Sequence, residues 1–454
     1  MGPCIVHLGR GAIIVENPPQ YLKDGLRRFI HRRGGGAYED LYSLSKDGKI
    51  LVSAPGFASR VKRLCGNARV VDERCPMPVP LLGAAISGCE TWSEVICKAV
   101  SACGGVVSVP DILGFARMAM AVLRAFPRDG LLDRGTPLSV ISAKDSADAR
   151  RIYRELAALL PDREVGLSLT SRYTESEDII IAPYDAMYDI QTQYAGVLIG
   201  DVSGDGNFGK WARNVSAIRT AARWGICSTS FGGAVEIGMD VEGLFGPLVA
   251  SASYEDAVRA GIGTPVTVVW IPCPAPLTAL GSAPFKTLED MATWRNDSFV
   301  KLVADIFGHV QSEEGCLLCT EQVDLARRVS ALLPSVVELN GKTPAKERKA
   351  ALDDLAGGTI RKAIVSSGCF PRYIDHGVMI VVNCGSGEMP GWSIPWRHLK
   401  KPGEKTWLVD FRHDWDRHNG RPGRLALNDE ARMRHYREMG FSQMTVDGVA
   451  QLPF

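Results

Sequence analysis

The chain has 454 residues, of which 46% are hydrophobic and 23% are charged, and its formal net charge is +1. This length allows two or three domains with buried cores, and the composition is typical of a soluble globular protein. No run approaches about 18 uncharged apolar residues, and the N-terminus lacks a charged-then-apolar leader pattern. We therefore expect a cytoplasmic protein without membrane contact.

The charge is unevenly distributed along the chain. Residues 1–74 hold 13 Lys and Arg against 7 Asp and Glu, and residues 397–437 hold 11 against 6, so the remainder is acidic. Two basic regions that flank an acidic middle fit an elongated polyanion as partner. A solvated surface explains either basic run equally well.

Residues 1–82 are predicted to form a small α+β accessory domain. Residues 21–30 have helical spacing with a basic face, and the three glycines at 34–36 should break that helix. Residues 38–54 alternate like a hairpin with its turn at 46–49. Alternating prolines form a stiff linker to the next domain, at positions Pro76, Pro78 and Pro80.

Residues 83–275 alternate between strand and helix, which predicts a parallel α/β sheet with its chemistry at the strand ends. The predicted strands cover 106–109, 138–141, 179–182, 197–200 and 224–227, and the predicted helices cover 115–126 and 211–223. Asp201 ends one apolar run, and the hydroxyl residues 228–230 end another.

Residues 276–454 repeat this alternation after a proline-rich hinge at 272–284, which predicts a second α/β domain. The predicted strands cover 316–319, 336–339, 363–365, 379–382 and 407–409, and the predicted helices cover 321–333, 345–355 and 431–439. The last of these helices is basic.

The stretch from 222 to 272 resembles the superfamily 2 DEAD/DEAH-like helicases of phages and bacteria, and the resemblance extends over most of the chain. It is carried by the wording ARWGICSTS and VEGLFGPLVASASYEDAVRAGIGTPVTVVWIP, with Asp201 at the preceding strand end. The resemblance implies two RecA-like parallel-sheet domains with a cleft between them, preceded by the accessory domain.

The resemblance also assigns the nucleotide-binding positions. In the family, a loop before the helix at 115–126 cradles the phosphates, its Lys reaches the β- and γ-phosphates, and its Ser or Thr holds Mg²⁺. Only Gly114 matches this loop here; Phe115 stands at the Lys position and Ala116 at the hydroxyl position. Trp92 matches the family's adenine-side aromatic residue.

The residues that the family uses for hydrolysis are replaced in part. Asp201 matches the Mg²⁺ ligand, but Val202 replaces the Glu that positions the attacking water. Arg397 matches one γ-phosphate arginine, and Lys400 replaces the second. A lysine lacks the planar fork of an arginine finger. We therefore expect Asp201, Arg397 and Lys400 to be remnants of a catalytic set.

Nucleic-acid contacts are predicted at the strand ends and in the basic N-terminal stretch. Polar groups and backbone amides at strand ends suffice for contacts with phosphates. The resemblance places such contacts at Ser142, Tyr184, Thr229, Thr320, Ser366 and Ser367, and the basic stretch adds Arg27 and Arg28.

These observations predict a helicase-fold protein that binds nucleic acid, DNA rather than RNA, and hydrolyses ATP poorly or not at all. We expect no cofactor. The alternatives are an active ATP-dependent DNA helicase, which would use ATP, Mg²⁺ and displaced residues such as Lys210 and Lys400, and a protein-interaction scaffold with a helicase fold. The prediction allows for a protein partner in either case.

Three further motifs have competing interpretations. Residues 204–210 fit a relocated phosphate loop or half of a calcium loop, but a flexible turn explains them more simply. The pair Cys316 and Cys319 lies in an apolar run and lacks a second ligand pair, so we expect no metal there. His413, Asp416 and His418 suggest a metal site, but a solvated loop is the simpler prediction.

Overall fold

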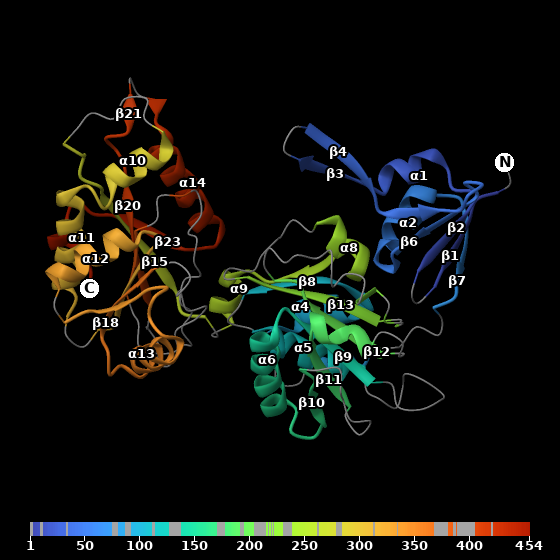
Figure 1. The fold of residues 1–454 in the computed structure, drawn as a ribbon. Helices are drawn as coiled ribbons and strands as arrows, with labels where there is room; N and C mark the ends of the chain where they lie inside the picture. The colour runs from blue at the N-terminus through green and yellow to red at the C-terminus, as the bar shows by residue number, and fades with distance from the viewer. Residues whose placement is uncertain are drawn as a thin grey trace. The chain divides into compact units, whose positions relative to one another are not determined.

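The computed structural model separates into two compact units, Met1–Ser253 and Tyr254–Phe454, and each is described by itself (Figure 1). It describes residues 3–454 except 10–11, 33–34, 75–79, 87–91, 111–113, 127–137, 170–177, 191–194, 204–214, 217, 219, 221, 230–237, 261–262, 278–283, 312–313, 334, 367–379, 385–386, 388–404 and 419–420.

The first unit begins with the accessory domain, residues 3–74, which is built on a mixed five-stranded sheet of order β5-β6-β2-β1-β7. Alternating apolar residues of β1 and β2, with Val61 of α2, form its core. Its elements are β1 (Ile5–Leu8), β2 (Ile13–Glu16), α1 (Gln20–Gly25), β3 (Arg27–Arg32), β4 (Gly35–Asp40), β5 (Tyr42–Leu44), β6 (Ile50–Ser53), η1 (Pro55–Phe57), α2 (Ala58–Cys65) and β7 (Arg69–Asp72).

The predicted helix over 21–30 is wrong beyond Gly25. α1 ends there, and β3 pairs with β4 in an antiparallel hairpin. The register places Arg27 opposite Asp40 and Arg28 opposite Glu39, so opposite charges face each other across the strands. Two of the three glycines expected to break a helix therefore lie in β4. The hairpin predicted over 38–54 is confirmed for 42–53, where β5 and β6 pair around the turn at 45–49. Residues 38–40 belong to β4 instead.

The rest of the first unit forms a seven-stranded, all-parallel sheet, called here the first sheet, of order β10-β11-β9-β12-β13-β8-β14. Its elements are α3 (Leu82–Ile86), α4 (Ser93–Ser101), β8 (Gly104–Pro110), α5 (Gly114–Ala125), β9 (Leu138–Ala143), α6 (Ser146–Leu159), β10 (Val165–Leu167), β11 (Ile179–Pro183), η5 (Tyr184–Ile190), β12 (Ala195–Asp201), β13 (Ala222–Thr229), α8 (Met239–Phe245) and β14 (Leu248–Ser251).

The five strands predicted in this region are confirmed, but the helix predicted over 211–223 extends too far. β13 already begins at Ala222, and residues 204–214 lie outside the described part of the chain. Successive residues of β13 point to opposite faces of the sheet. On one face, the ring centroids of Trp224 and Phe126 lie 5.1 Å apart. On the other face, the ring of Phe245 covers Gly225.

The accessory domain packs against α8 through a close backbone approach. A Cβ on Gly56 would overlap the carbonyl oxygen of Glu242, and one on Gly243 would lie 2.9 Å from the Phe57 ring. Arg60 reinforces the contact, because its Nε donates to Glu242 at 2.9 Å and its Nη2 donates to the second oxygen. Both glycines are therefore required by packing.

The second unit holds another seven-stranded, all-parallel sheet, called here the second sheet, of order β17-β18-β16-β19-β20-β15-β23. Its elements are α9 (Tyr254–Arg259), β15 (Val266–Pro272), α10 (Phe285–Ala292), α11 (Asp297–His309), β16 (Cys316–Thr320), α12 (Val323–Leu332), β17 (Val337–Leu339), α13 (Ala345–Gly357), β18 (Lys362–Ser366), β19 (Ile380–Asn383), β20 (Thr406–Arg412), β21 (Arg417–His418), β22 (Arg421–Pro422), α14 (Arg424–Glu438), β23 (Ser442–Thr445) and η6 (Val449–Gln451).

The predicted fold class is confirmed: two α/β domains with parallel sheets follow a small α+β domain. The predicted boundary after residue 275 lies after β15 in the chain, although β15 is a strand of the second sheet. The contacts between residues divide the chain after Ser253. Among the described helices, none has both the length and the apolar character needed to cross a bilayer.

Candidate nucleotide and nucleic-acid site

The carboxyl ends of the parallel strands in the first sheet bring the predicted site residues to one edge. Register pairs Gly200 with Ser142, and it pairs Thr229 with Pro110. Ligands bind outside this edge in open α/β sheets. The edge therefore collects Ser142, Tyr184, Asp201 and Thr229, which come from β9, η5, β12 and β13.

Asp201 is buried at this edge, with a relative exposure of 2%. One side-chain oxygen accepts a hydrogen bond from the Ser203 amide at 2.9 Å, and the Tyr184 hydroxyl donates to the Asp201 carbonyl oxygen. Burial raises the pKa of Asp201; Ser203 opposes this shift and the negative charge of Asp148 adds to it. The positive charge of Arg151 also opposes the shift, so the carboxylate is compensated in part.

The start of α5, where the resemblance places the phosphate loop, presents an apolar residue. Gly114 has φ +64°, which favours glycine, and Phe115 and Ala116 behind it are 0% and 1% exposed. The Phe115 ring therefore packs into the domain. A Cβ on Gly114 would lie 3.7 Å from a carboxylate oxygen of Glu155, so α6 brings a negative charge to this helix start.

The other predicted nucleotide contact, Trp92, is 6% exposed and precedes α4 as its N-cap residue. Its indole nitrogen has no hydrogen-bond partner among the described residues. A buried Trp N–H usually has a hydrogen-bond partner, and Trp92 stays a predicted nucleotide contact.

Three of the predicted nucleic-acid contacts are fully buried hydroxyls. Ser142 donates to the Ile199 carbonyl oxygen at 3.4 Å, and Ser366, in the second unit, donates to that of Leu339 at 3.4 Å. Thr320 accepts from the Gln322 amide at 3.0 Å. In this conformation, these hydroxyls form hydrogen bonds with backbone groups of their own domains. Their contacts with nucleic acid stay predictions.

Arg27 and Arg28 are held in ion pairs on β3. Arg27 Nε donates to Asp40 at 2.7 Å, while Arg28 bridges Glu39 and, across to α8, Asp240. The pKa of Arg28 is raised because these carboxylates outweigh the effect of burial. A phosphate would have to compete with these acids for either arginine.

Several predicted site residues lie outside the described residues. These residues are Lys210, Ser367, Arg397 and Lys400.

A buried ionic cluster at the end of β20 in the second unit is missing from the predictions. Asp410 is 0% exposed and accepts hydrogen bonds from Asn383 at 3.0 Å, Tyr436 at 2.9 Å and Arg432 at 3.1 and 3.2 Å. Arg432 also donates to Asp429 at 2.9 Å. We call these five residues the Asp410 cluster. Its sequence signal was an acid inside an apolar strand, the same signal that identified Asp201.

The expectation that residues 412–418 form a solvated loop is wrong for His413 and Asp416, which are 3% and 5% exposed. His413 Nδ1 lies 3.1 Å from Asp429, and Asp416 accepts from the Leu425 amide at the start of α14 at 2.8 Å. Burial would lower the pKa of His413, but Cys273 and Asp429 together raise it to about 10. Within the described residues, no group of His, Cys, Asp and Glu has a metal-binding arrangement.

No protein-family model matches the sequence, and no curated protein does either. Among solved structures, a fragment assigned to an HsdR subunit of a type I restriction enzyme from Vibrio vulnificus YJ016 is similar at 14% identity and TM-score 0.55, covering 95% of this chain and 84% of that chain.

Two further solved structures are similar at lower scores. UvsW of T4 has 13% identity and TM-score 0.40 over 98% of this chain and 100% of its own. S. cerevisiae Dbp5 bound to RNA and ADP BeF3 has 10% identity and TM-score 0.49 over 80% of this chain and 93% of its own. The likeness to the Vibrio fragment concerns the fold of the chain.

Proposed function

We propose that this chain, which has the fold of superfamily 2 helicases, binds nucleic acid and hydrolyses ATP poorly or not at all. The observation that carries the proposal is the fully buried Phe115 ring in the first turn of α5. A phosphate loop needs a lysine that reaches out from this position. An inward-packed ring offers neither charge nor a hydrogen-bond donor.

The surroundings of Phe115 argue in the same direction. Ala116 cannot hold Mg²⁺ through a hydroxyl, and the Glu155 carboxylate beside Gly114, which is paired with Arg151 at 3.3 Å, offers no positive charge to a triphosphate. Each charge-assisted hydrogen bond that a lysine would make here is worth roughly 1.5–3 kcal/mol of binding. The positive end of the α5 dipole remains, but it is worth only about 0.3–1 kcal/mol at an exposed site.

Asp201 fits a magnesium site only in part. Its carboxylate is at the right strand end, but it is buried next to Asp148, and Val202 beside it is 6% exposed and cannot position a water. If Mg²⁺ were present, Asp201 would hold it and the ion would neutralise phosphate charge. Replacement of the second arginine by Lys400 would cost up to roughly 10³–10⁵ in rate.

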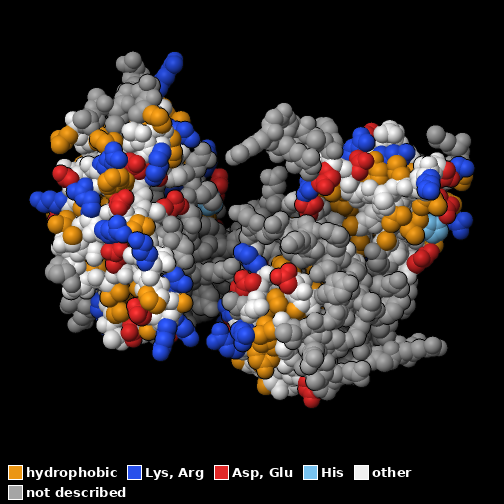
Figure 2. Space-filling model, viewed as in Figure 1, with side chains coloured by type: hydrophobic (Ala, Val, Ile, Leu, Met, Phe, Trp, Pro, Cys, Tyr) orange, Lys and Arg blue, Asp and Glu red, His pale blue; other side chains and the backbone are white. Residues whose placement is uncertain are grey.

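The nucleic-acid part of the proposal rests on the strand-end polar residues and on the basic excess of residues 1–74. On the face seen in Figure 2, Lys and Arg side chains of the second unit are interspersed with Asp and Glu. We propose that binding comes from contacts at strand ends and from arginines that exchange their carboxylate partners for phosphates. DNA is the partner that we propose.

A thermal-shift measurement with MgATP tests the ATP part of the proposal. A ligand at 100 times its Kd adds roughly 2.7 kcal/mol of stability, so tight binding would be visible. We expect no shift at millimolar MgATP for the unchanged chain, and recovery of binding in Phe115→Lys with Ala116→Thr. A clear shift that Lys210→Ala abolishes would overturn the proposal and favour a relocated phosphate loop at 204–210.

Salt-dependent DNA binding tests the other part. Removing one phosphate contact lowers the slope of log K against log salt by about 0.9 for duplex DNA. Arg27→Ala with Arg28→Ala should therefore lower it by up to about 1.8, equally for unrelated sequences. The matched control is Lys346→Ala with Lys349→Ala, two exposed lysines of α13. Absence of any salt-sensitive DNA binding would favour the protein-interaction scaffold.

A further inference from the structure

We propose that a cavity between the accessory domain and the amino end of the first sheet binds a small phosphate-bearing anion, such as phosphate or pyrophosphate. The cavity has a volume of about 180 Å³. It lies at the start of β8 and β13, where Gly104 and Arg223 line it. The nucleotide and nucleic-acid site lies at the opposite ends of these strands, so the two sites are distinct.

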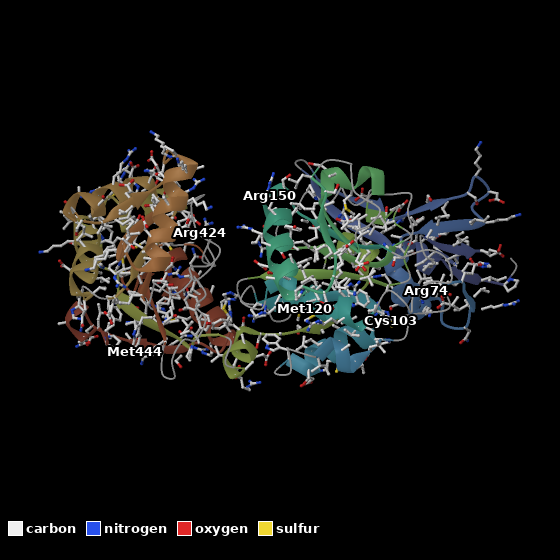
Figure 3. All side chains as sticks on the ribbon, turned by 90° about the horizontal axis from the view of Figure 1, so that it is seen from below. Arg74, Cys103, Met120, Arg150, Arg424 and Met444 are labelled. Carbon is white, nitrogen blue, oxygen red and sulfur yellow. The ribbon has the colours of Figure 1, made fainter. Side chains whose placement is uncertain are left out.

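Both parts of the first unit contribute cations to the wall. Lys62 of α2 and Arg74 after β7 come from the accessory domain, and Arg223 of β13 comes from the first sheet, whereas the described residues of the wall include no Asp or Glu. Figure 3 labels Arg74 and Cys103, which lie next to each other although they come from these two different parts. Three positive charges at one small volume favour an anion.

The cations are held in position by contacts outside the cavity. Arg74 donates through Nε and Nη2 to Asp72 at 2.8 and 2.7 Å, and Lys62 Nζ lies 3.7 Å from the same carboxylate. Arg74 lowers the pKa of Asp72 to about 2. The Asp72 carboxylate therefore contacts both cations. Both side chains are preorganised by this shared partner.

Arg223 is 5% exposed and donates to the carbonyl oxygens of Leu244 at 3.1 Å and Ile218 at 2.8 Å. Burial lowers its pKa to about 10, so the guanidinium stays protonated at neutral pH. A bound anion would offset the cost of keeping this charge in the interior. This gives the cavity a physical reason to prefer an anion over water.

The size of the cavity selects the ligand. Sites for drug-sized molecules occupy about 300–1,000 Å³, so a nucleoside triphosphate would not fit. A phosphate or pyrophosphate would fit, and its oxygens accept charge-assisted hydrogen bonds from arginine and lysine. Since the cations come from both parts, occupancy would tie the accessory domain to the first sheet.

The test is calorimetric titration of the full chain with sodium phosphate and with pyrophosphate, at constant ionic strength and without DNA or ATP. We expect saturable binding that weakens at least tenfold in Lys62→Ala with Arg74→Gln. Ala102→Phe, which fills the cavity from its exposed rim and keeps every charge, should weaken binding as much. Lys98→Ala, an exposed lysine on α4 outside the cavity, should leave binding unchanged.

Absence of saturable binding of either anion, or equal binding by all variants, would overturn the inference. A competition arm separates free anions from nucleic-acid phosphates. If a short DNA duplex occupies the cavity and neither free anion does, the inference is overturned and the cavity belongs to the nucleic-acid track. Because no arm needs DNA binding or ATP turnover to succeed, the inference and the proposed function can fail independently.

Discussion

Asp201 on β12 and Asp410 on β20 are both buried acids on inner strands of parallel sheets, but their hydrogen-bond partners differ. Both end or nearly end a parallel strand, and they are 2% and 0% exposed. Asp410 accepts five hydrogen bonds, from three side chains and the Phe411 amide. Asp201 accepts from the Ser203 amide at 2.9 Å and is hydrogen-bonded to the Ser203 side chain, and the opposite charges of Asp148 and Arg151 act on it. Burial of an acid therefore does not identify chemistry; the set of partners separates a structural carboxylate from one available to a ligand.

Removal of Arg432 should have the largest effect on this comparison. Arg432→Met leaves Asp410 and Asp429 buried without their shared cation, and a broken buried pair costs about 3–5 kcal/mol. Amide hydrogen exchange in β20 and α14 should speed up accordingly. Arg434→Met, on the exposed face of the same helix, should change protection by less than about 0.5 kcal/mol. Equal protection in both variants would show that the Asp410 cluster is not structural.

Replacing each acid by its uncharged amide tests directly whether the two carboxylates have different roles. Burial raises the pKa of Asp410 as well as that of Asp201. Asp410→Asn should still destabilise the second unit by roughly 2–3 kcal/mol, because it weakens the hydrogen bonds to the buried Arg432. Asp201→Asn should be neutral or stabilising near pH 7, since its raised pKa means that ionisation opposes folding there. This advantage should disappear as pH falls below about 4. Urea unfolding across that range measures both; destabilisation by Asp201→Asn at pH 7 would contradict the comparison.

His413 gives the Asp410 cluster a pH dependence of the opposite sense. Its pKa is raised from 6.5 to about 10, so its stabilising contribution is complete below pH 6.5 and is lost as pH rises toward 10. One pKa unit corresponds to about 1.36 kcal/mol, so the upper bound of this contribution is roughly 5 kcal/mol. His413→Gln should lack this alkaline loss in urea unfolding between pH 6.5 and 9.5. His435→Gln, where burial lowers the pKa, should keep it.

The smallest effect concerns two matched hydroxyls, Ser142 in the first sheet and Ser366 in the second. Both are buried and donate to a carbonyl oxygen at 3.4 Å, so Ser→Ala at either should cost no more than about 0.5–1 kcal/mol. If these hydroxyls also contact nucleic acid, as predicted, affinity for DNA should fall several-fold while the unfolding midpoint hardly moves. Unchanged affinity in both variants would remove them from the predicted site.

The two sheets could be predicted from the sequence because buried parallel strands appear as short continuous apolar runs. The runs at 138–141, 179–182 and 363–365 each became a strand. Strand order was not available in the same way. β15 precedes the predicted domain boundary yet lies inside the second sheet, between β20 and β23. Only pairing with strands far along the chain, such as Val266 with Thr406, assigns it there.

The errors in the candidate site have a shared physical cause. Residues 21–30 have helical spacing, but Arg27 and Arg28 find their acids across a strand pair, which local spacing does not report. His413 looked like a solvated loop residue because its partner, Asp429, lies on α14. The periodicity of a sequence does not indicate which polar residues pair with partners far along the chain. Asp201 was found because the apolar run that precedes it is adjacent in the sequence.

The glycine contact between η1 and α8 has a consequence for the modularity of the chain. Because Gly56 lies against the backbone of α8, a module with a side chain at that position could not replace the accessory domain without moving one of the two backbones. Deleting residues 1–74 would leave Asp240 and Glu242 without their arginines and remove six net positive charges, so the remaining chain would carry a net charge of −5. A fragment trimmed to residues 75–454 would thus be acidic, with two unpaired carboxylates on α8, and would serve poorly as a stand-in for the whole protein.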